Sequence, residues 1–251
     1  MLKQIATASL GEERARQLKH HLHARLQTAR KPLHVVNRYF AAPLHRAVVN
    51  PINRARHEGR TDRKLEIGPG SDVLDGFETL DVITGSNVTY VGQALSLPFR
   101  DDTFQVVYAS HIIEHVPWYQ VPMALKEWVR VLQPGGQLKV WTPDGLKIAK
   151  AFVEAEESGE TDFHKDGWWR FNEGHDPCVW ASGRCFSYGD GTGRNDHPNW
   201  HRALFSPRYL KQLFRGAGLV EIREMDRSEV LGHDHGWINL GVCGTKPKLE
   251  G

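Results

Sequence analysis

Short apolar runs alternate with polar turns along residues 64–143 of this 251-residue chain. The runs are of the length that is usual for buried strands. The run at residues 104–108 is apolar apart from Gln105, as expected of a central strand in a parallel sheet. The pattern predicts strands at residues 64–67, 77–80, 87–91, 104–108 and 137–142.

Apolar residues at helical spacing lie on both sides of these strands and between them. Leucines recur every four residues among basic side chains, which predicts an amphipathic basic helix over residues 10–30. A second helix is expected from His34 to Val49, ending ahead of Pro51 because proline interrupts helices. Further helices are predicted over residues 119–132 and 146–157. We therefore expect a helical cap at residues 1–62, ahead of a second domain at residues 63–251.

The turn between the first two strands indicates a nucleoside-binding site. Gly68 and Gly70 would let backbone N–H groups approach a ligand, and a carboxylate placed like Asp81 accepts hydrogen bonds from ribose hydroxyls. A dinucleotide motif would have a third glycine at Val73, so a pyrophosphate ligand is disfavoured. Glu66 would repel phosphates but suits a ligand with an amine and a sulfonium. An ordinary tight turn is the alternative interpretation.

Five motifs in this order resemble the class I S-adenosylmethionine-dependent methyltransferases. They are L-E-I-G-P-G, L-D-V, G-Q-A-L-S-L-P-F, D-D-T-F-Q-V-V-Y-A-S-H-I-I-E-H-V and E-W-V-R-V-L-Q-P-G-G-Q-L. Residues Phe205 to Leu219 also resemble the helix and turn before that family's last two strands. The resemblance implies an α/β fold, with a doubly wound, mostly parallel seven-stranded Rossmann-like sheet. It also implies an enzyme with S-adenosyl-L-methionine as its cofactor.

The resemblance also assigns roles to individual residues. The glycine turn would line the methionine and ribose part of the cofactor, Asp81 would bind the ribose hydroxyls, and the segment from Gln93 would contact the adenine. The residues after the fourth strand would border the methionine end. The cofactor-binding residues expected on this basis are Glu66, Gly68, Pro69, Gly70, Asp81, Gln93, Ala94, Leu95, Ala109 and Ser110.

Two features depart from the family pattern. Gln93 stands where the family usually has an aspartate that accepts from the adenine amine, and a glutamine carbonyl accepts such a bond without charge assistance. The interval from Gly70 to Asp81 leaves little room for the usual first helix. Members with a shortened turn are similar to methyltransferases of bacterial surface-polysaccharide assembly.

An insertion at about residues 144–204 follows the fifth strand and is rich in tryptophan, histidine, glycine and aspartate. A segment of this length is more typical of a functional lid than of a passive loop. Aromatic planes among hydrogen-bonding groups suit a polar, ring-shaped acceptor such as a sugar. Alternatively, the tryptophans give the insertion a small core of its own. They are Trp168, Trp169, Trp180 and Trp200.

Methylation of a hydroxyl requires removal of its proton, and histidine is suited to this near neutral pH. His111 is the first candidate because it follows the fourth strand, although it could instead shape the cofactor pocket. His201, in N-W-H-R-A-L-F, is the second. Glu114 and His115 lie one helical turn beyond His111 and are interpreted as orienting or structural residues.

No metal site is expected. Cys178, Cys185, His175 and His197 could supply four zinc ligands, but the six residues between the cysteines do not match the tight pairs of structural zinc sites. With Cys243, the cysteines are odd in number, which argues against a disulfide framework and for reduced thiols.

Charge is distributed unevenly along the chain. Residues 1–64 hold 14 Lys or Arg and 4 Asp or Glu, giving +10, whereas the remainder holds 18 and 26, giving −8; together they give the net +2. The basic part could meet an anionic partner (a phosphorylated substrate, a nucleic acid or a membrane surface), or be a solvated helix face. No integral membrane segment or apolar signal-peptide core is found, so a cytoplasmic protein is expected.

The leading hypothesis is therefore transfer of a methyl group to an oxygen of a saccharide or other polar small-molecule acceptor. Methylation of nucleic acid is an alternative that the basic N-terminal part favours. However, the Pro-Pro-aromatic signature of base-methylating relatives is replaced here by residues 110–113, Ser-His-Ile-Ile. A third alternative is a module that binds S-adenosylmethionine without catalysis, which Gln93 would permit.

Overall fold

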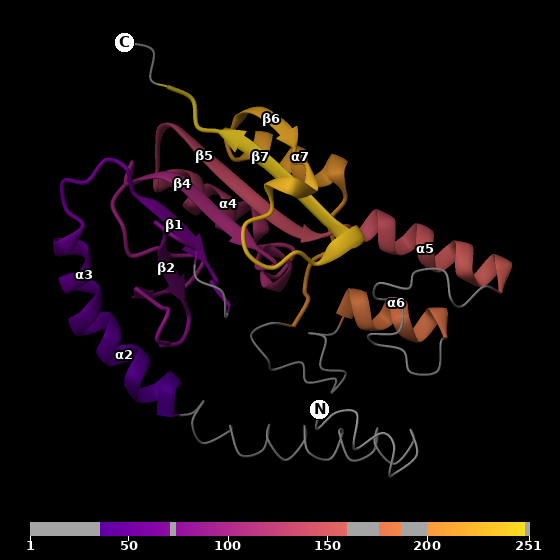
Figure 1. The fold of residues 1–251 in the computed structure, drawn as a ribbon, viewed down its shortest axis with the longest axis horizontal. Helices are drawn as coiled ribbons and strands as arrows, with labels where there is room; N and C mark the ends of the chain where they lie inside the picture. Colours follow the sequence, from indigo (N-terminus) through magenta and orange to yellow (C-terminus); the bar gives the residue numbers. More distant parts are fainter. Residues whose placement is uncertain (1–35, 71–73, 160–175, 187–199, 249–251) are drawn as a thin grey trace.

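A seven-stranded sheet with strand order β3-β2-β1-β4-β5-β7-β6 forms the centre of the computed structural model (Figure 1). The structure describes residues 36–70, 74–159, 176–186 and 200–248. β7 is antiparallel to β5 and β6, and all other pairs are parallel, which confirms the expected fold class. The strands are β1 (Lys64–Ile67), β2 (Glu78–Asp81), β3 (Tyr90–Val91), β4 (Phe104–Ser110), β5 (Leu132–Pro143), β6 (Val220–Glu224) and β7 (Asn239–Thr245).

The two faces of the sheet are covered differently. Helices α4 (Val121–Arg130) and α7 (Pro207–Gly216) pack on the face that carries the main hydrophobic core, with Trp128 and Phe214 fully buried. The other face carries Tyr108 and Trp141, against which loop residues pack. Among the described residues of the short interval from 70 to 81 there is no helix, as the sequence predicts.

Two predicted strands have different lengths in the structure. β3 covers only Tyr90–Val91 because Thr79 binds residues 87 and 89 through its hydroxyl group instead of through a ladder of backbone bonds. β5 begins at Leu132 instead of 137 and runs through Pro134-Gly135-Gly136, where the register with β4 shifts between Phe104 and Val106. Such irregularities let a strand accommodate proline and glycine.

A continuous helix covers Asn37–Arg56 in four segments: η1 (Asn37–Ala41), α2 (Ala42–Leu44), η2 (His45–Val49) and α3 (Asn50–Arg56). The prediction that it would end before Pro51 is wrong. η1 and η2 are π-wound, and each is followed two residues later by a proline, Pro43 or Pro51. The wider π turn moves the preceding carbonyls away from the proline ring, so the helix continues. The predicted helix at residues 10–30 lies outside the described residues.

The helix docks on the sheet edge through polar side chains. Asn50 donates to Val91 O at 2.8 Å and accepts from Val91 N at 3.0 Å, so its amide pairs with the edge strand as another strand would. Asn53 donates to Thr89 O at 2.8 Å. The opposite side of the helix is apolar and exposed, with Val36, Phe40, Leu44, Val48 and Ile52 four residues apart.

The insertion contributes a small second core. α5 (Gly145–Ser158) confirms the helix predicted at 146–157, and α6 (Pro177–Phe186) packs beside it. Trp180 is fully buried between them and Trp237, which favours the interpretation of this tryptophan as a core residue. Trp168, Trp169, His164, His175 and His197 lie outside the described residues.

Short 3₁₀ turns complete the described elements at η3 (Ile113–His115), η5 (Arg227–Glu229) and η6 (Gly236–Ile238). Within the described ranges, no helix combines the length and the apolar character needed to cross a bilayer.

Candidate active site

A cavity of about 450 Å³ opens at the carboxyl ends of β1 and β2. The strand order reverses between β1 and β4, and ligands of open α/β sheets bind at such a point. The volume is within the usual range of small-molecule sites. Its lining includes Gly68, Asp81, Gln93, Ala94 and Leu95, all expected from the sequence to bind the cofactor.

Gly68 can only be glycine in this backbone. Its φ is +70°, and an added Cβ atom would lie 2.0 Å from Cδ1 of Ile112, which also lines the cavity. The turn is held by a backbone bond from Gly68 N to Leu80 O at 2.8 Å. Gly70 also has a positive φ, but an added Cβ there would meet open space.

Asp81 ends β2 with its carboxylate at the cavity. Oδ1 accepts a hydrogen bond from Ile83 N at 3.2 Å, which fixes the side chain in the turn. Burial raises the pKa of Asp81, although bonds from the backbone of Ile83 and Val82 oppose the shift. A carboxylate that is short of donors in a partly buried site suits a ligand that brings hydroxyl groups.

Two side chains of α4 hold the loop that follows β3 by hydrogen bonds. Trp128 Nε1 donates to Ala94 O at 2.8 Å, and Leu97 N donates to Glu127 Oε1 at 2.6 Å. These bonds hold the backbone of Ala94 and Leu95 at the cavity, while the side chain of Gln93 is exposed. Such an arrangement can present backbone groups to a flat heterocycle.

The other expected cofactor residues lie around a neighbouring cavity of about 350 Å³ that shares Gly68 with the first. Glu66, Pro69, Gly70 and Ser110 line it, together with loop residues 231–233 and His235. Ala109 lines neither cavity, because its side chain is fully buried in the main core.

His111 lines neither of these two cavities, and its φ is +54°. Its Nε2 is 2.9 Å from Asn239 Oδ1 and its Nδ1 is 3.2 Å from Glu114 Oε1. Its ring is tilted by 31° against that of His235, with 3.6 Å between centroids. Asn239 Nδ2 donates to Asp234, which leaves Oδ1 as the acceptor. Both ring nitrogens of His111 therefore face acceptor oxygens.

His201 lies beside Glu114 and His115, which the sequence analysis interprets as orienting or structural residues. Arg202 N and Ala203 N donate to Glu114 O at 2.7 and 3.2 Å, so the end of the insertion is fixed against η3. The rings of His115 and His201 are then 5.2 Å apart. One ligand atom each of Glu114, His115 and His201 lies within 4.8 Å of the others.

Burial and charge act on this cluster in opposite directions. Burial would raise the pKa of Glu114, but the neighbouring His111 ring, with His115 and His201, lowers it to about 2. Burial lowers the pKa of His115, although Glu114 opposes the shift. The carboxylate is therefore ionised at neutral pH, and His115 is neutral there.

Several polar residues at the cavity were not expected from the sequence to line it. Arg46 from the N-terminal helix and Arg202 from the insertion line it together with His115 and Gln120. Arg46, Gln120 and Arg202 lie outside the quoted motifs, whereas His115 lies within one of them. Helix docking and the contact of residues 202–203 with Glu114 bring the two arginines to the cavity.

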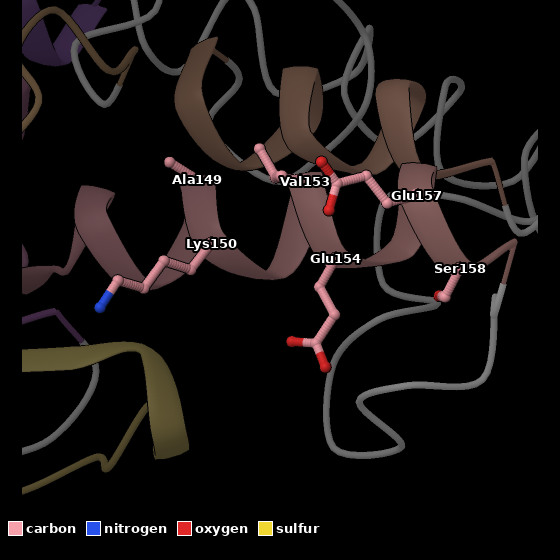
Figure 2. Close-up of a pocket in the computed structure, with 6 residues that line it drawn as sticks. All are labelled: Ala149, Lys150, Val153, Glu154, Glu157 and Ser158. Atoms are coloured by element: carbon pink, nitrogen blue, oxygen red, sulfur yellow. The ribbon is translucent and has the colours of Figure 1, made fainter.

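A larger hollow, of about 690 Å³, lies along α5 (Figure 2). Its described lining comes from that one helix. Lys150, Glu154 and Glu157 point in different directions there. None of the expected site residues lines it, so the cavity at the strand ends is the better candidate.

The described residues fit the cofactor that the resemblance implies. A Cβ at Gly68 would reach Ile112 at the wall of the cavity, and Asp81 offers a carboxylate at the next strand. Glu66 and Ser110 line the adjoining cavity, where a cationic or amino-bearing part of a ligand would be favoured. When bound, S-adenosylmethionine supplies a methyl group on a sulfonium.

Comparisons with known proteins point to a methyltransferase domain. Residues 76–140 match the family model described as "Methyltransferase domain". The chain is 44% identical over 52 residues to the uncharacterized protein YafE of Escherichia coli K12, a match that covers 21% of this chain. It therefore spans about a quarter (24%) of that relative's length.

Solved structures are similar in fold. A S-adenosylmethionine-dependent methyltransferase of Thermotoga maritima, described as a possible histamine N-methyltransferase, is 20% identical with a TM-score of 0.44, covering 85% of this chain and 98% of that one. The YcgJ protein of Bacillus subtilis is 15% identical with a TM-score of 0.41, covering 81% and 99%. The family model thus identifies residues 76–140 as part of a methyltransferase domain, an enzyme domain whose cofactor is S-adenosyl-L-methionine.

Proposed function

We propose that the protein methylates a hydroxyl oxygen of a saccharide or a related polar small molecule. The observation that carries this proposal is an exposed aromatic pair beside the cavity. Trp118 and Tyr119 are 66% and 62% exposed, contact each other edge to face, and lie between the lining residues Pro117 and Gln120. Aromatic planes beside hydrogen-bonding groups are suited to sugar rings. We also propose that the protein is related to the methyltransferases of bacterial surface-polysaccharide assembly.

His201 is the better of the two proposed bases. Its Nδ1 is 3.0 Å from Arg184 O, a carbonyl that can only accept, so Nδ1 carries the hydrogen and Nε2 carries the lone pair. An imidazole of this tautomer can take the proton of an acceptor hydroxyl. His111 has acceptors at both nitrogens and is proposed as a positioning residue for Glu114.

The basic N-terminal part is proposed to take part in binding an anionic group. Arg46 from the helix and Arg202 from the insertion both line the cavity. Two guanidinium groups at one cavity favour a ligand with a phosphate or carboxylate group, such as a nucleotide-linked sugar. Residues 1–62 would then act as a cap that completes the acceptor side.

Calorimetry and a labelling screen test the proposed function. The protein should bind S-adenosylmethionine in the low micromolar range, about −8 kcal/mol, and should not bind NAD more tightly. Radiolabelled methyl groups should be transferred to glycans or nucleotide sugars. Label in nucleic acid instead would favour the alternative methyltransferase, and cofactor binding without transfer to any acceptor class would favour the non-catalytic module.

Replacing Trp118 tests the acceptor class. Trp118→Ala should raise the KM for a saccharide acceptor about tenfold, because base- or sugar-stacking on an aromatic ring contributes on the order of 1 kcal/mol. Affinity for S-adenosylmethionine should not change. Met123→Ala, which removes a similarly exposed apolar residue one turn away on α4, is the matched control. An unchanged KM in Trp118→Ala would remove the aromatic pair from the acceptor site.

A further inference from the structure

We propose that Glu114, His115 and His201 form a binding site for a divalent transition-metal cation. The site rests on contacts of these three side chains. What the cation would do there rests, in addition, on the proposed function.

The two imidazoles have the tautomer that metal ligands need. Nδ1 of His201 lies 3.0 Å from Arg184 O and Nδ1 of His115 lies 3.4 Å from Trp200 O. Each carbonyl oxygen accepts from its Nδ1, so each Nε2 offers a lone pair. A ligating histidine usually donates its second ring N–H to such a carbonyl, which fixes the ring and keeps it oriented toward the metal.

The carboxylate is buried and has few partners. Glu114 is 2% exposed, and its Oε2 accepts from Thr142 Oγ1 at 3.2 Å. Among the described residues, Oε1 has only the ion-pair contact with His111 Nδ1 at 3.2 Å and no hydrogen bond of good geometry. A buried anionic oxygen with so little compensation is costly, and a cation would lower that cost.

The separations are close to those of a bound metal. The three ligand atoms lie within 4.8 Å of one another. Metal bonds of about 2.0–2.2 Å bring ligand atoms to roughly 3–3.5 Å apart, so loading would draw the side chains inward by about an ångström. Two imidazoles and one carboxylate suit Zn²⁺, Fe²⁺ or Mn²⁺ better than Mg²⁺ or Ca²⁺, which prefer oxygen ligands.

Three protein ligands leave at least one coordination position open, as in catalytic metal sites. His115 lines the cofactor cavity, so that position is within reach of an acceptor. A cation would coordinate the acceptor hydroxyl and lower its pKa. The proton would then leave to solvent water, and the resulting alkoxide oxygen would form the new bond to the methyl carbon as the bond from that carbon to sulfur breaks. In the loaded enzyme, His201 is thus a ligand and not the base.

Metal binding can be measured without turnover. Protein purified with a chelator is titrated with Zn²⁺ against a chromogenic competitor, and with Co²⁺ while its visible absorption is recorded. We expect one equivalent of Zn²⁺ with a micromolar or lower Kd, and a Co²⁺ spectrum typical of four or five ligands including nitrogen. His201→Ala and His115→Ala should each weaken binding at least about 100-fold, more than the loss of an orienting partner.

Controls separate ligation from folding and from the proposed function. His233→Ala removes an exposed histidine of the neighbouring cavity and should bind Zn²⁺ as wild type does. Glu114→Gln keeps the volume of the buried side chain if the histidine variants fold poorly. Absence of stoichiometric metal, or equal binding in His201→Ala, would overturn the site while leaving cofactor binding and methyl transfer intact. Failure of the proposed function would instead appear as metal binding without label transfer to saccharides.

Discussion

Gly68 couples the backbone of the first turn to the wall of the cofactor cavity, because the space a Cβ would fill is occupied by Ile112. Gly68→Ala should therefore weaken S-adenosylmethionine binding about tenfold or more, with a loss of stability of about 1–2 kcal/mol from the positive φ. Gly76→Ala is the matched control, since its φ is +74° and its Cβ would meet open space. Calorimetry should show wild-type affinity in the control, and Ile112→Ala should partly restore Gly68→Ala. Wild-type affinity in Gly68→Ala itself would contradict the role of this turn.

Asp81 gives cofactor binding a pH dependence. Burial raises its pKa, and the ionised carboxylate is the form that accepts from ribose hydroxyls. Affinity should be constant above this raised pKa and fall as the pH is lowered through it. Asp81→Asn should bind more weakly by roughly 1.5–3 kcal/mol at neutral pH, the value of a hydrogen bond to a charged group. Titrations between pH 7 and 4.5 should show no such decline in the variant; an equal decline in both would assign it to another group.

At the scale of single residues, the sequence predicts those cavity residues that belong to continuous motifs. Gly68 and Asp81 lie at the cavity because a strand and its turn place them there locally. Arg46 and Arg202 were not assigned to the cavity, since they reach it only through the docking of a helix and the contact of residues 202–203 with Glu114. Their spacing in sequence carries no information about that contact.

At the scale of secondary-structure elements, the side chain of Asn50 joins the N-terminal helix to the sheet edge. Replacing it with Leu leaves the N–H and C=O of Val91 without their partner. Each unsatisfied buried group costs about 1–3 kcal/mol, so Asn50→Leu should lower the free energy of unfolding in urea by at least that amount. Ala55→Leu on the exposed side of the same helix should have little effect. A similar small loss in both variants would show that this edge is paired in another way.

The elements themselves were mostly predictable, and the exceptions have local causes. The helix passes Pro51 because a π-wound turn precedes it, which a periodicity based on 3.6 residues per turn does not include. β5 passes Pro134 because the register shift absorbs it. In both cases a backbone irregularity allows a residue that normally ends the element.

For the whole molecule, the cofactor cavity joins parts that are far apart in the chain. Its walls come from the N-terminal helix, from β1 and β2, from η3 and from the insertion at Arg202. Binding should therefore stabilise all of them together. At 100 times Kd, S-adenosylmethionine should add about 2.7 kcal/mol. This corresponds to a rise in Tm of roughly 5–11 °C for a chain of this size. Differential scanning fluorimetry should show this shift, with none from NAD and a smaller one in Asp81→Asn.

The pairing of Asn50 with Val91 cannot form until both segments have left the ribosome. The helix leaves the ribosome first, but its partner strand is 41 residues later in the chain. At about 5–20 residues per second, that interval is roughly 2–8 s. During this time the polar side of the helix around Asn50 is without the sheet edge that it binds in the folded protein. Arg46, on the same helix, can therefore join the cavity only after the edge strand has emerged.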